Sequence, residues 1–566
     1  MRVFIKGSNS SVILNKSDFL ASGGEGAVYA KGDTAYKLYT DPSKALPEGK
    51  IAELAAIADP NVIRPKDVLL NEQGHPLGYT MRYVTDTLAL CQLFPRAFRE
   101  REGLDHTKVG SLVLAMRKSV TEIHRAGVLV VDLNELNVLV SSDFSQAYWI
   151  DVDSYQTKHY PATAIMASVR DPLVSHNAFN EGSDWFSFGI LAFQLFIGIH
   201  PFKGKHSTLK NFEDRMKAGI SVFNSSVSVP KVCYPLDVIP EAYKSWFRAV
   251  FEEKKRLPPP ADLIVSAVVQ QLRTTLSTSG IDVARLTEWA TAILQYFPGS
   301  VAGTDVVRLS DGSVHVGSSV VCKVTESIEV GHTPVGHLPV VAWKKGRDIH
   351  LFGGRTQIPF QSSADELASY DGRLFLRNRD KILEILLVEM QNADGTPKII
   401  ASTRELATVM EQSSILFSGG VVQNMLGSVF VSIFPRAKTS YQFRIPALDG
   451  YKILSAKYDR RVLMVVAGKK GRYSRFIFRF DSEFSKFDMR EISDITPTGL
   501  NFVVLDTGVC VSMNEDETLE IFHSDPGAFK TKLVDDPSLG NDMRLYRQNG
   551  RVLFTQGVSL SSMRMK

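Results

Sequence analysis

The sequence predicts a multidomain protein in which an α+β region is followed by an all-β region. Its 566 residues exceed the size of one ordinary domain. Apolar residues recur at helical spacing over 103–127, whereas short strand-like segments dominate from about residue 300 onward. We therefore expect an α+β domain at 1–275, a helical linker at 276–300 and an all-β domain at 301–566.

The composition is that of an ordinary globular protein and argues against several other classes. Hydrophobic residues make up 44% of the chain, and a net charge of +4 is small for this length, so we expect no nucleic-acid partner. The four cysteines are far apart and form no C-x-x-C pair, which indicates neither a disulfide framework nor a zinc site. The longest apolar run (189–199) is too short to span a membrane, and the N-terminal residues do not resemble a signal peptide. We therefore expect a cytoplasmic protein without membrane contact.

Charged and amide side chains interrupt two apolar segments between Ile123 and Tyr155. Asn137 follows Asp132 by five residues, and Asp151 follows Asn137 by fourteen. Carboxylates are rarely buried unless they are paired or bind a metal. This spacing suits the metal-triphosphate end of a phosphotransferase. Taken alone, the stretch is equally compatible with a β-hairpin that has polar ends.

The motif V-D-L-N-E-L-N-V-L-V resembles the catalytic loop of protein kinases, and D-V-D stands where D-F-G usually does. The D-L-N-E-x-N and D-V-D-S-Y motifs are most similar to those of bacterial Hanks-type serine/threonine kinases. The resemblance implies that Asp132 is the catalytic base and that Asn137 and Asp151 hold Mg²⁺ against the phosphates of ATP.

Four positions in this stretch depart from the family pattern. Val130 and Val131 replace the usual His-Arg, Asn134 replaces a lysine, and Asp153 replaces the glycine of D-F-G. None of these changes removes the base or a metal ligand. Because Val131 cannot bind a phosphate as arginine does, we expect activity not to require a phosphorylated activation segment.

A glycine-rich segment, A-S-G-G-E-G-A-V-Y, spans residues 21–29 between strand-like stretches. Glycines allow backbone amides to approach a phosphate closely, although a simple hairpin turn is the commoner use of such a segment. Gly23, Gly26 and Val28 fall in register with the kinase glycine loop, while Ala21 replaces its first glycine. The resemblance implies that Gly23, Gly24 and Gly26 cover the phosphates of ATP and that Val28 also contacts the nucleotide.

Lys37 lies in an apolar strand, A-Y-K-L-Y, that resembles the kinase strand whose lysine holds the α- and β-phosphates. The alternative is a lysine that faces solvent. The helix expected at 44–58 should carry the carboxylate partner of this lysine. Glu53 is preferred over Glu48 because it lies inside the helix, and a surface glutamate is the competing interpretation.

The resemblance extends over both lobes of a kinase. It implies a small lobe at about 1–85, a hinge in which Met81 and Tyr83 meet the adenine of ATP, and a large lobe at about 86–275. The long helix that begins near Asp184 and ends at H-P-F matches the central helix of the large lobe. Arg256 falls at the structural arginine of the family, whereas R-D-P-L at 170–173 is a poor substitute for A-P-E.

The C-terminal half contains many short strands but no constellation of titratable residues. Four of the strands begin near residues 427, 460, 508 and 550, a spacing of about 40 residues that suits the blade of a β-propeller. The region would hold roughly six blades, and a pair of β-sandwiches is the alternative.

The sequence thus predicts an ATP- and Mg²⁺-dependent serine/threonine protein kinase. Its protein substrate or partner would bind through the C-terminal β domain, which would otherwise regulate access to the site. A pseudokinase scaffold is one alternative, since several family positions are altered. A kinase-fold enzyme that phosphorylates a small molecule or transfers AMP is another, since the A-P-E element is poor.

Overall fold

The computed structural model describes the chain except for residues 9, 23–25, 163–164, 176–177, 262–279, 354–355, 392–396, 470–471, 498, 528, 537, 541 and 566. The chain divides into two compact units. The first contains Met1–Arg273 and the short segments Gly468–Tyr473 and Thr496–Thr498, and the second contains the remainder.

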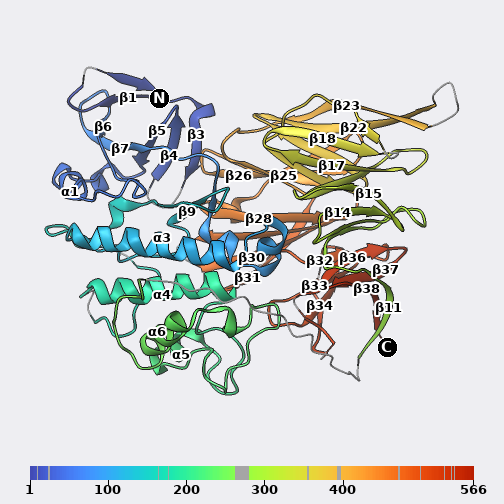
Figure 1. Cartoon of the computed structure of the whole chain (residues 1–566). Coiled ribbons are helices and arrows are strands. Elements are labelled where there is room, and N and C mark those ends of the chain that lie inside the picture. The colour runs from blue at the N-terminus through green and yellow to red at the C-terminus, as the bar shows by residue number, and fades with distance from the viewer. Residues whose placement is uncertain are drawn as a thin grey trace. The chain divides into compact units, whose positions relative to one another are not determined.

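The first unit begins with a seven-stranded antiparallel sheet in the order β2-β1-β6-β7-β5-β4-β3 (Figure 1). The elements that build it are β1 (Arg2–Ile5), β2 (Ser11–Ile13), η1 (Lys16–Asp18), β3 (Phe19–Ser22), β4 (Gly26–Lys31), β5 (Thr34–Tyr39), η2 (Pro42–Lys44), α1 (Glu48–Leu54), β6 (Val68–Leu70) and β7 (Pro76–Arg82). Helix α1 is shorter than the predicted helix at 44–58 because Pro47 occupies its N-cap position and fixes its start at Glu48.

Strands β4 and β5 approach each other closely at Gly26. A Cβ atom at this position would lie 2.1 Å from the carbonyl oxygen of Leu38, so only glycine fits without a backbone shift. The same pairing places Val28 opposite Lys37. The predicted phosphate-covering residues Gly23 and Gly24 lie outside the described residues.

The rest of the first unit is mainly helical, apart from a three-stranded sheet in the order β10-β9-β8. Its elements are β8 (Thr87–Ala89), η3 (Leu90–Leu93), α2 (Arg96–Glu102), α3 (His106–Arg125), β9 (Val138–Ser141), β10 (Ala147–Trp149), η4 (Val152–Ser154), α4 (Glu181–Ile197), α5 (Phe212–Ala218), η5 (Leu236–Val238) and α6 (Glu241–Phe251). Helices α3 and α4 lie side by side (Figure 1).

Helix α4 is buried on every side from Ser183 to Ile197. The side chain of Asn180 caps its N-terminus by accepting the Ser183 N–H at 3.1 Å, and Gly198 ends the helix in the left-handed region at φ +89°. A helix that is apolar all around forms the centre of a domain, so α4 fixes the elements that contact it.

His200, which follows α4, is buried and uses both of its ring nitrogens. Nε2 lies 2.9 Å from the Ser168 carbonyl oxygen, and Nδ1 accepts the Phe202 N–H at 3.2 Å. This pattern requires the neutral ring, and burial lowers the pKa of His200 to about 3.

The depressed pKa of His200 predicts a loss of stability in acid. Between its unfolded pKa of about 6.5 and the folded value, only the unfolded chain binds the proton, so stability falls as the pH falls. We expect the unfolding free-energy difference between wild type and His200→Gln to shrink by about 2 kcal/mol from pH 7 to pH 5. Urea denaturation at the two pH values measures this change, and a constant difference would show that His200 titrates alike in both states.

The described residues of the second unit form seven four-stranded sheets. The first four are β12–β15 (Ile293–Phe297, Val306–Leu309, Ser313–Val316, Ser319–Lys323), β16–β19 (Ile328–His332, Pro339–Lys345, Asp348–Gly353, Thr356–Ile358), β20–β23 (Glu366–Tyr370, Arg373–Asn378, Lys381–Gln391, Pro397–Thr408) and β24–β27 (Ser414–Phe417, Gly420–Met425, Ser428–Arg436, Thr439–Arg444). The others are β28–β31 (Lys452–Asp459, Val462–Lys469, Arg472–Phe480, Phe487–Ser493), β32–β35 (Phe502–Val504, Val509–Met513, Leu519–His523, Thr531–Val534) and β36–β38 (Arg544–Gln548, Arg551–Gln556, Ser559–Met565) with β11 (Ile281–Glu288). One 3-10 turn, η6 (Pro446–Leu448), follows β27.

The predicted helical linker at 276–300 is wrong where the structure describes it, because β11 and β12 occupy that stretch. Strand β11 pairs antiparallel with β38, with Ile281 opposite Met565. A partner nearly 300 residues away in the sequence therefore decides the conformation, which local helical spacing could not reveal. These strands also explain why the structure has seven sheets where the spacing predicted roughly six.

Hydrogen bonds connect the seven sheets into a closed circuit. Each sheet is bonded to the next, and the last to the first, at the strand that begins each sheet or at the turn after it. The pairs, in circuit order, are Gln295–Ile328, Ser369–Glu329, Leu416–Glu366, Tyr458–Ser418, Val504–Asp459, Arg547–Val504 and Gln548–Asp305.

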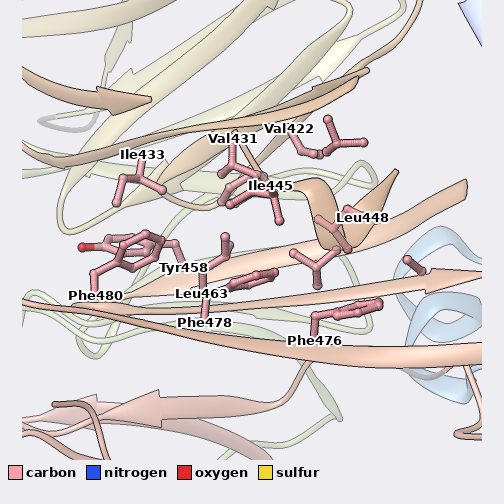
Figure 2. Packing of buried hydrophobic residues seen from close by; sticks show 14 of the residues in the cluster. Val422, Val431, Ile433, Ile445, Leu448, Tyr458, Leu463, Phe476, Phe478 and Phe480 are labelled. Carbon is pink, nitrogen blue, oxygen red and sulfur yellow. The ribbon is translucent and has the colours of Figure 1, made fainter. Parts of the chain in front are cut away.

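Neighbouring sheets pack through apolar faces. Figure 2 shows Val431 and Ile433 of β26 near Leu463 of β29 and Phe478 and Phe480 of β30, all nearly inaccessible to water. Burial of side chains of this size contributes about 1.5–3 kcal/mol each.

In the part of the chain that the structure describes, no helix combines the length and apolar character required to cross a bilayer.

Candidate active site

Lys37 of β5 binds two carboxylates from the segment after β10. Its Nζ lies 2.6 Å from Asp151 Oδ1 and 2.7 Å from Asp153 Oδ2. Burial alone lowers the pKa of Lys37, but the negative charges of Asp153 and Asp151 outweigh it and raise that pKa. The lysine is therefore charged and inward-facing, and the alternative of a solvent-facing lysine is wrong.

The β9–β10 hairpin brings Asn137 and Asp151 to the same end. Val138 pairs with Trp149, and the Ile150 N–H donates to the Asn137 carbonyl oxygen at 2.9 Å. Asp151 adopts a left-handed backbone at φ +60° and has a side chain that is 39% exposed. The hairpin alternative and the phosphotransferase interpretation are thus compatible, because the polar ends of the hairpin are themselves the candidate site.

Asp132 lies on the loop between α3 and β9 and is held beside Asn137. The Asn137 Nδ2 group donates to the Asp132 carbonyl oxygen at 3.1 Å, and Asn134 Nδ2 donates to the same oxygen at 3.2 Å. Asn134, which replaces the lysine of the family pattern, therefore stabilises this loop from within.

The carboxylate of Asp132 also contacts the following segment. Its Oδ1 accepts the backbone N–H of Met166 at 2.9 Å. This bond ties the loop that carries Asp132 to the segment around Met166.

Asp184 in the first turn of α4 fixes the backbone before Asp132. Its two carboxylate oxygens accept the N–H groups of Val130 at 2.8 Å and Val131 at 2.9 Å, and His124 Nε2 lies 2.9 Å from Oδ2. These bonds hold Val131 at φ +62°, a conformation that a β-branched residue adopts at a cost of about 1–3 kcal/mol.

The Val131 side chain occupies an apolar cluster rather than a polar pocket. The cluster joins the catalytic loop to the segment that follows Asp151, and its members are Val131, Ala162, Phe179, Leu129, Ile165 and Val174. Apolar packing thus occurs at the position where an arginine of the family would meet a phosphate.

The predicted pairing of Glu53 with Lys37 is not found, and Asp153 binds Lys37 instead. Glu53 accepts hydrogen bonds from the backbone N–H and the ring of His159. Glu48, the other candidate, pairs with Lys6 at the surface. Sequence reasoning missed Asp153 because its position is normally a glycine.

The two hinge candidates lie at the C-terminal end of β7, the middle strand of the seven-stranded sheet. Met81 in β7 pairs with Ala35, and the Tyr83 N–H donates to the Asp33 carbonyl oxygen at 2.9 Å. Their contact with adenine stays a prediction. Because the Tyr83 N–H already donates to Asp33, that bond would have to break before this N–H could bind adenine.

Asp171 supplies the ion pair that the poor A-P-E substitute seemed to lack. Its carboxylate binds the Arg256 guanidinium at two atoms, each at 2.5 Å, and its side chain is 2% exposed. The bidentate pair anchors the end of the segment that begins at Asp151. An aspartate thus meets the predicted structural arginine, although the surrounding residues do not resemble A-P-E.

The donor set around Asp151 fits Mg²⁺ only together with phosphate oxygens. Among the described residues, no group of three or more His, Cys, Asp or Glu side chains could hold a metal. Mg²⁺ is typically bound by one or two protein oxygens plus substrate phosphates and water, and the Asp151 carboxylate and Asn137 amide can supply these oxygens.

The comparisons with known proteins identify protein kinases as relatives of part of the chain. No protein-family model matches it. "Protein kinase YegI" of Escherichia coli (strain K12) is 26% identical over 265 residues, covering 41% of this chain and 40% of that protein. "Ribosomal protein S6 kinase alpha-3" of Mus musculus is 21% identical over 187 residues, covering 30% of this chain and 24% of that protein.

The solved structure of the Cydia pomonella granulovirus kinase PK-1 aligns with a TM-score of 0.31 and 14% identity, covering 42% of this chain and 88% of that one. The chain spans about two fifths of the length of YegI. The relationship to YegI supports a protein-kinase-like protein.

Proposed function

We propose that the chain is an ATP- and Mg²⁺-dependent serine/threonine protein kinase. The observation that carries the proposal is the meeting of Lys37 with Asp151, 114 residues later, at the end of the hairpin that also carries Asn137. A lysine, two oxygen ligands and the nearby carboxylate of Asp132 are the groups that phosphoryl transfer requires.

Each residue of the site has a distinct role in this proposal. Lys37 binds the phosphates of ATP, and Asn137 and Asp151 hold Mg²⁺, which neutralises charge that develops on the phosphates. Asp132 orients the acceptor hydroxyl and receives its proton. The buried Asp184 keeps the loop that carries Asp132 in place.

A protein substrate is favoured over a small molecule by the Asp171–Arg256 ion pair. This pair fixes the end of the segment that begins at Asp151 and thereby stabilises a surface on which a peptide could bind. The small-molecule kinase and AMP-transferase alternatives rested on a poor anchor at this point.

We further propose that the second unit is a seven-bladed β-propeller that binds a protein partner. Seven four-stranded sheets and the closed circuit of hydrogen bonds between them support this architecture. The pairing of β11 with β38 completes the last sheet with a strand from the beginning of the unit. A pair of β-sandwiches would instead require two large stacked sheets in each sandwich.

Labelled ATP tests the proposed reaction. The purified protein is incubated with Mg²⁺, a panel of protein substrates and ATP labelled in either the γ- or the α-phosphate. Transfer of γ-label to serine or threonine supports the kinase, transfer of α-label supports an AMP transferase, and transfer of neither supports the pseudokinase scaffold.

Activity should not require phosphorylation of the segment after Asp151, because Val131 packs there through apolar contacts. A phosphatase-treated variant with Thr157, Thr163 and Ser168 all changed to alanine should retain its rate within about threefold, the spread expected from small packing changes alone. Mass spectrometry verifies that phosphate is absent. A loss of tenfold or more, with ATP binding unchanged, would contradict this account.

A further inference from the structure

Asp153 is a buried carboxylate at the candidate site whose hydrogen bonds converge on Lys37. It lies in η4, two residues after Asp151, and its side chain is 5% exposed. Both oxygens accept from Lys37 Nζ, at 2.9 and 2.7 Å, and Tyr39 donates to Oδ2 at 2.7 Å. Burial raises the pKa of Asp153, but Lys37 and the tyrosine hydroxyls lower it overall, so the carboxylate is ionised.

Helix α1 approaches the same segment with a cation rather than a carboxylate. Lys50 is buried on the face of α1 that also buries Ile51 and Leu54, and its Nζ donates to the Asp153 carbonyl oxygen at 2.6 Å. In most kinases the corresponding helix supplies a glutamate to the phosphate-binding lysine. Here α1 instead uses Lys50 to hold the backbone of Asp153, the residue that binds Lys37.

The acidic residues of α1 are engaged elsewhere. Glu53 binds His159, and the polar side chains of Thr157 and His159 lower the Glu53 pKa to about 2. Glu48 binds Lys6.

We propose that Asp153 is the positioning residue for Lys37, holding its ammonium group at the catalytic centre in place of a carboxylate from helix α1. The proposal rests on the kinase function proposed above. Lys37 is shared between the half-exposed Asp151 and the buried Asp153. If Asp151 serves as a metal ligand, Asp153 would keep the lysine in position.

The arrangement makes the position of Lys37 depend on the Asp151–Asp153 segment. A shift of α1 would reach Lys37 through Lys50 and the backbone of Asp153, and also through Ile51, which packs in one cluster with Tyr39 and Tyr79. The ion pair is also enclosed by aromatic rings, whose centroids lie 5.7 Å (Tyr39) and 5.8 Å (Tyr79) from Nζ. Among the residues that the structure describes, the charged and titratable groups that face Lys37 include Asp151, Asp153, Tyr39 and Tyr79, with Lys50 on the far side of Asp153.

The test compares Asp153→Asn with Glu53→Gln, two changes that each remove one carboxylate charge and preserve size. Binding of Mg²⁺·ATP is measured by calorimetry, and kcat and KM for ATP are measured by γ-phosphate transfer. Asp153→Asn should weaken ATP binding and raise KM by at least about tenfold, while Glu53→Gln stays within twofold of wild type.

A double-mutant cycle separates positioning from a general structural effect. In a Lys37→Met background, Asp153→Asn should change ATP affinity by less than twofold, since its effect acts through the lysine. If Asp153→Asn does not fold, Lys50→Met replaces it in the cycle, because this change leaves the Asp153 carboxylate intact. Lys50→Met should weaken ATP binding severalfold in the wild-type background and should not weaken it in the Lys37→Met background.

The outcomes distinguish this inference from the proposed function. Two outcomes would overturn the role of Asp153 and leave the kinase proposal intact, provided that the wild type turns over ATP. One is a tenfold loss of ATP binding in Glu53→Gln. The other is unchanged ATP binding in both Asp153→Asn and Lys50→Met. A wild-type protein that neither binds nor turns over ATP overturns both.

Discussion

Replacing Asp151 with alanine should lower the rate of phosphoryl transfer by at least about 10³-fold. The change removes the carboxylate that we expect to bridge Mg²⁺ to the phosphates. It also removes the closer of the two carboxylates at Lys37 Nζ, 2.6 Å away. Single-turnover transfer from γ-labelled ATP measures the effect without interference from product release.

A matched control is available on the same hairpin. Asp143 lies in the turn between β9 and β10 and binds Ser141 and Ser145 there. Asp143→Ala should retain activity within about threefold, because it alters an exposed turn and no group of the site. Both variants should melt within a few degrees of wild type. Normal turnover by a folded Asp151→Ala protein would exclude Asp151 from the reaction.

The candidate site could be predicted from the sequence where its residues lie close together in the chain. Asp132, Asn137 and Asp151 belong to one hairpin and the loop before it, so their spacing already limits their geometry. The start of α4 was predicted only to within one turn, because the helix expected to begin near Asp184 is capped by Asn180 and begins at Glu181.

The partner of Lys37 could not be predicted in this way. Which face of α1 turns inward depends on packing against distant residues, and that face carries Lys50 rather than Glu53. One signal was present in the sequence, since Lys50 shares its helical face with Ile51 and Leu54. A charged residue on an apolar face indicates a buried partner, although not which one.

The second unit shows the same limit at a larger scale. Turn residues and alternating apolar positions identify individual strands, because both are local features. Whether the last sheet has its fourth strand depends on β11, whose pairing with the distant β38 makes it a strand. The count of roughly six therefore failed, although the all-β character of the region was predictable.

Changing Asp132 to asparagine should lower kcat by about 10²–10⁴-fold and leave the KM for ATP within about threefold. The asparagine cannot receive the proton of the acceptor hydroxyl. Its amide oxygen can still accept the Met166 N–H that Asp132 Oδ1 accepts at 2.9 Å, so the loop should keep its conformation. Steady-state kinetics with varied ATP, at saturating protein substrate, separates the two parameters.

The contrast with Lys37 gives this prediction its internal control. Lys37→Met should raise the KM for ATP, because Lys37 is expected to bind the phosphates, whereas Asp132→Asn should act on the chemical step alone. Calorimetric binding of Mg²⁺·ATP should therefore be weakened in Lys37→Met and unchanged in Asp132→Asn. If Asp132→Asn instead lost ATP affinity and kept its kcat, Asp132 would belong to the nucleotide-binding groups and another residue would have to serve as the base.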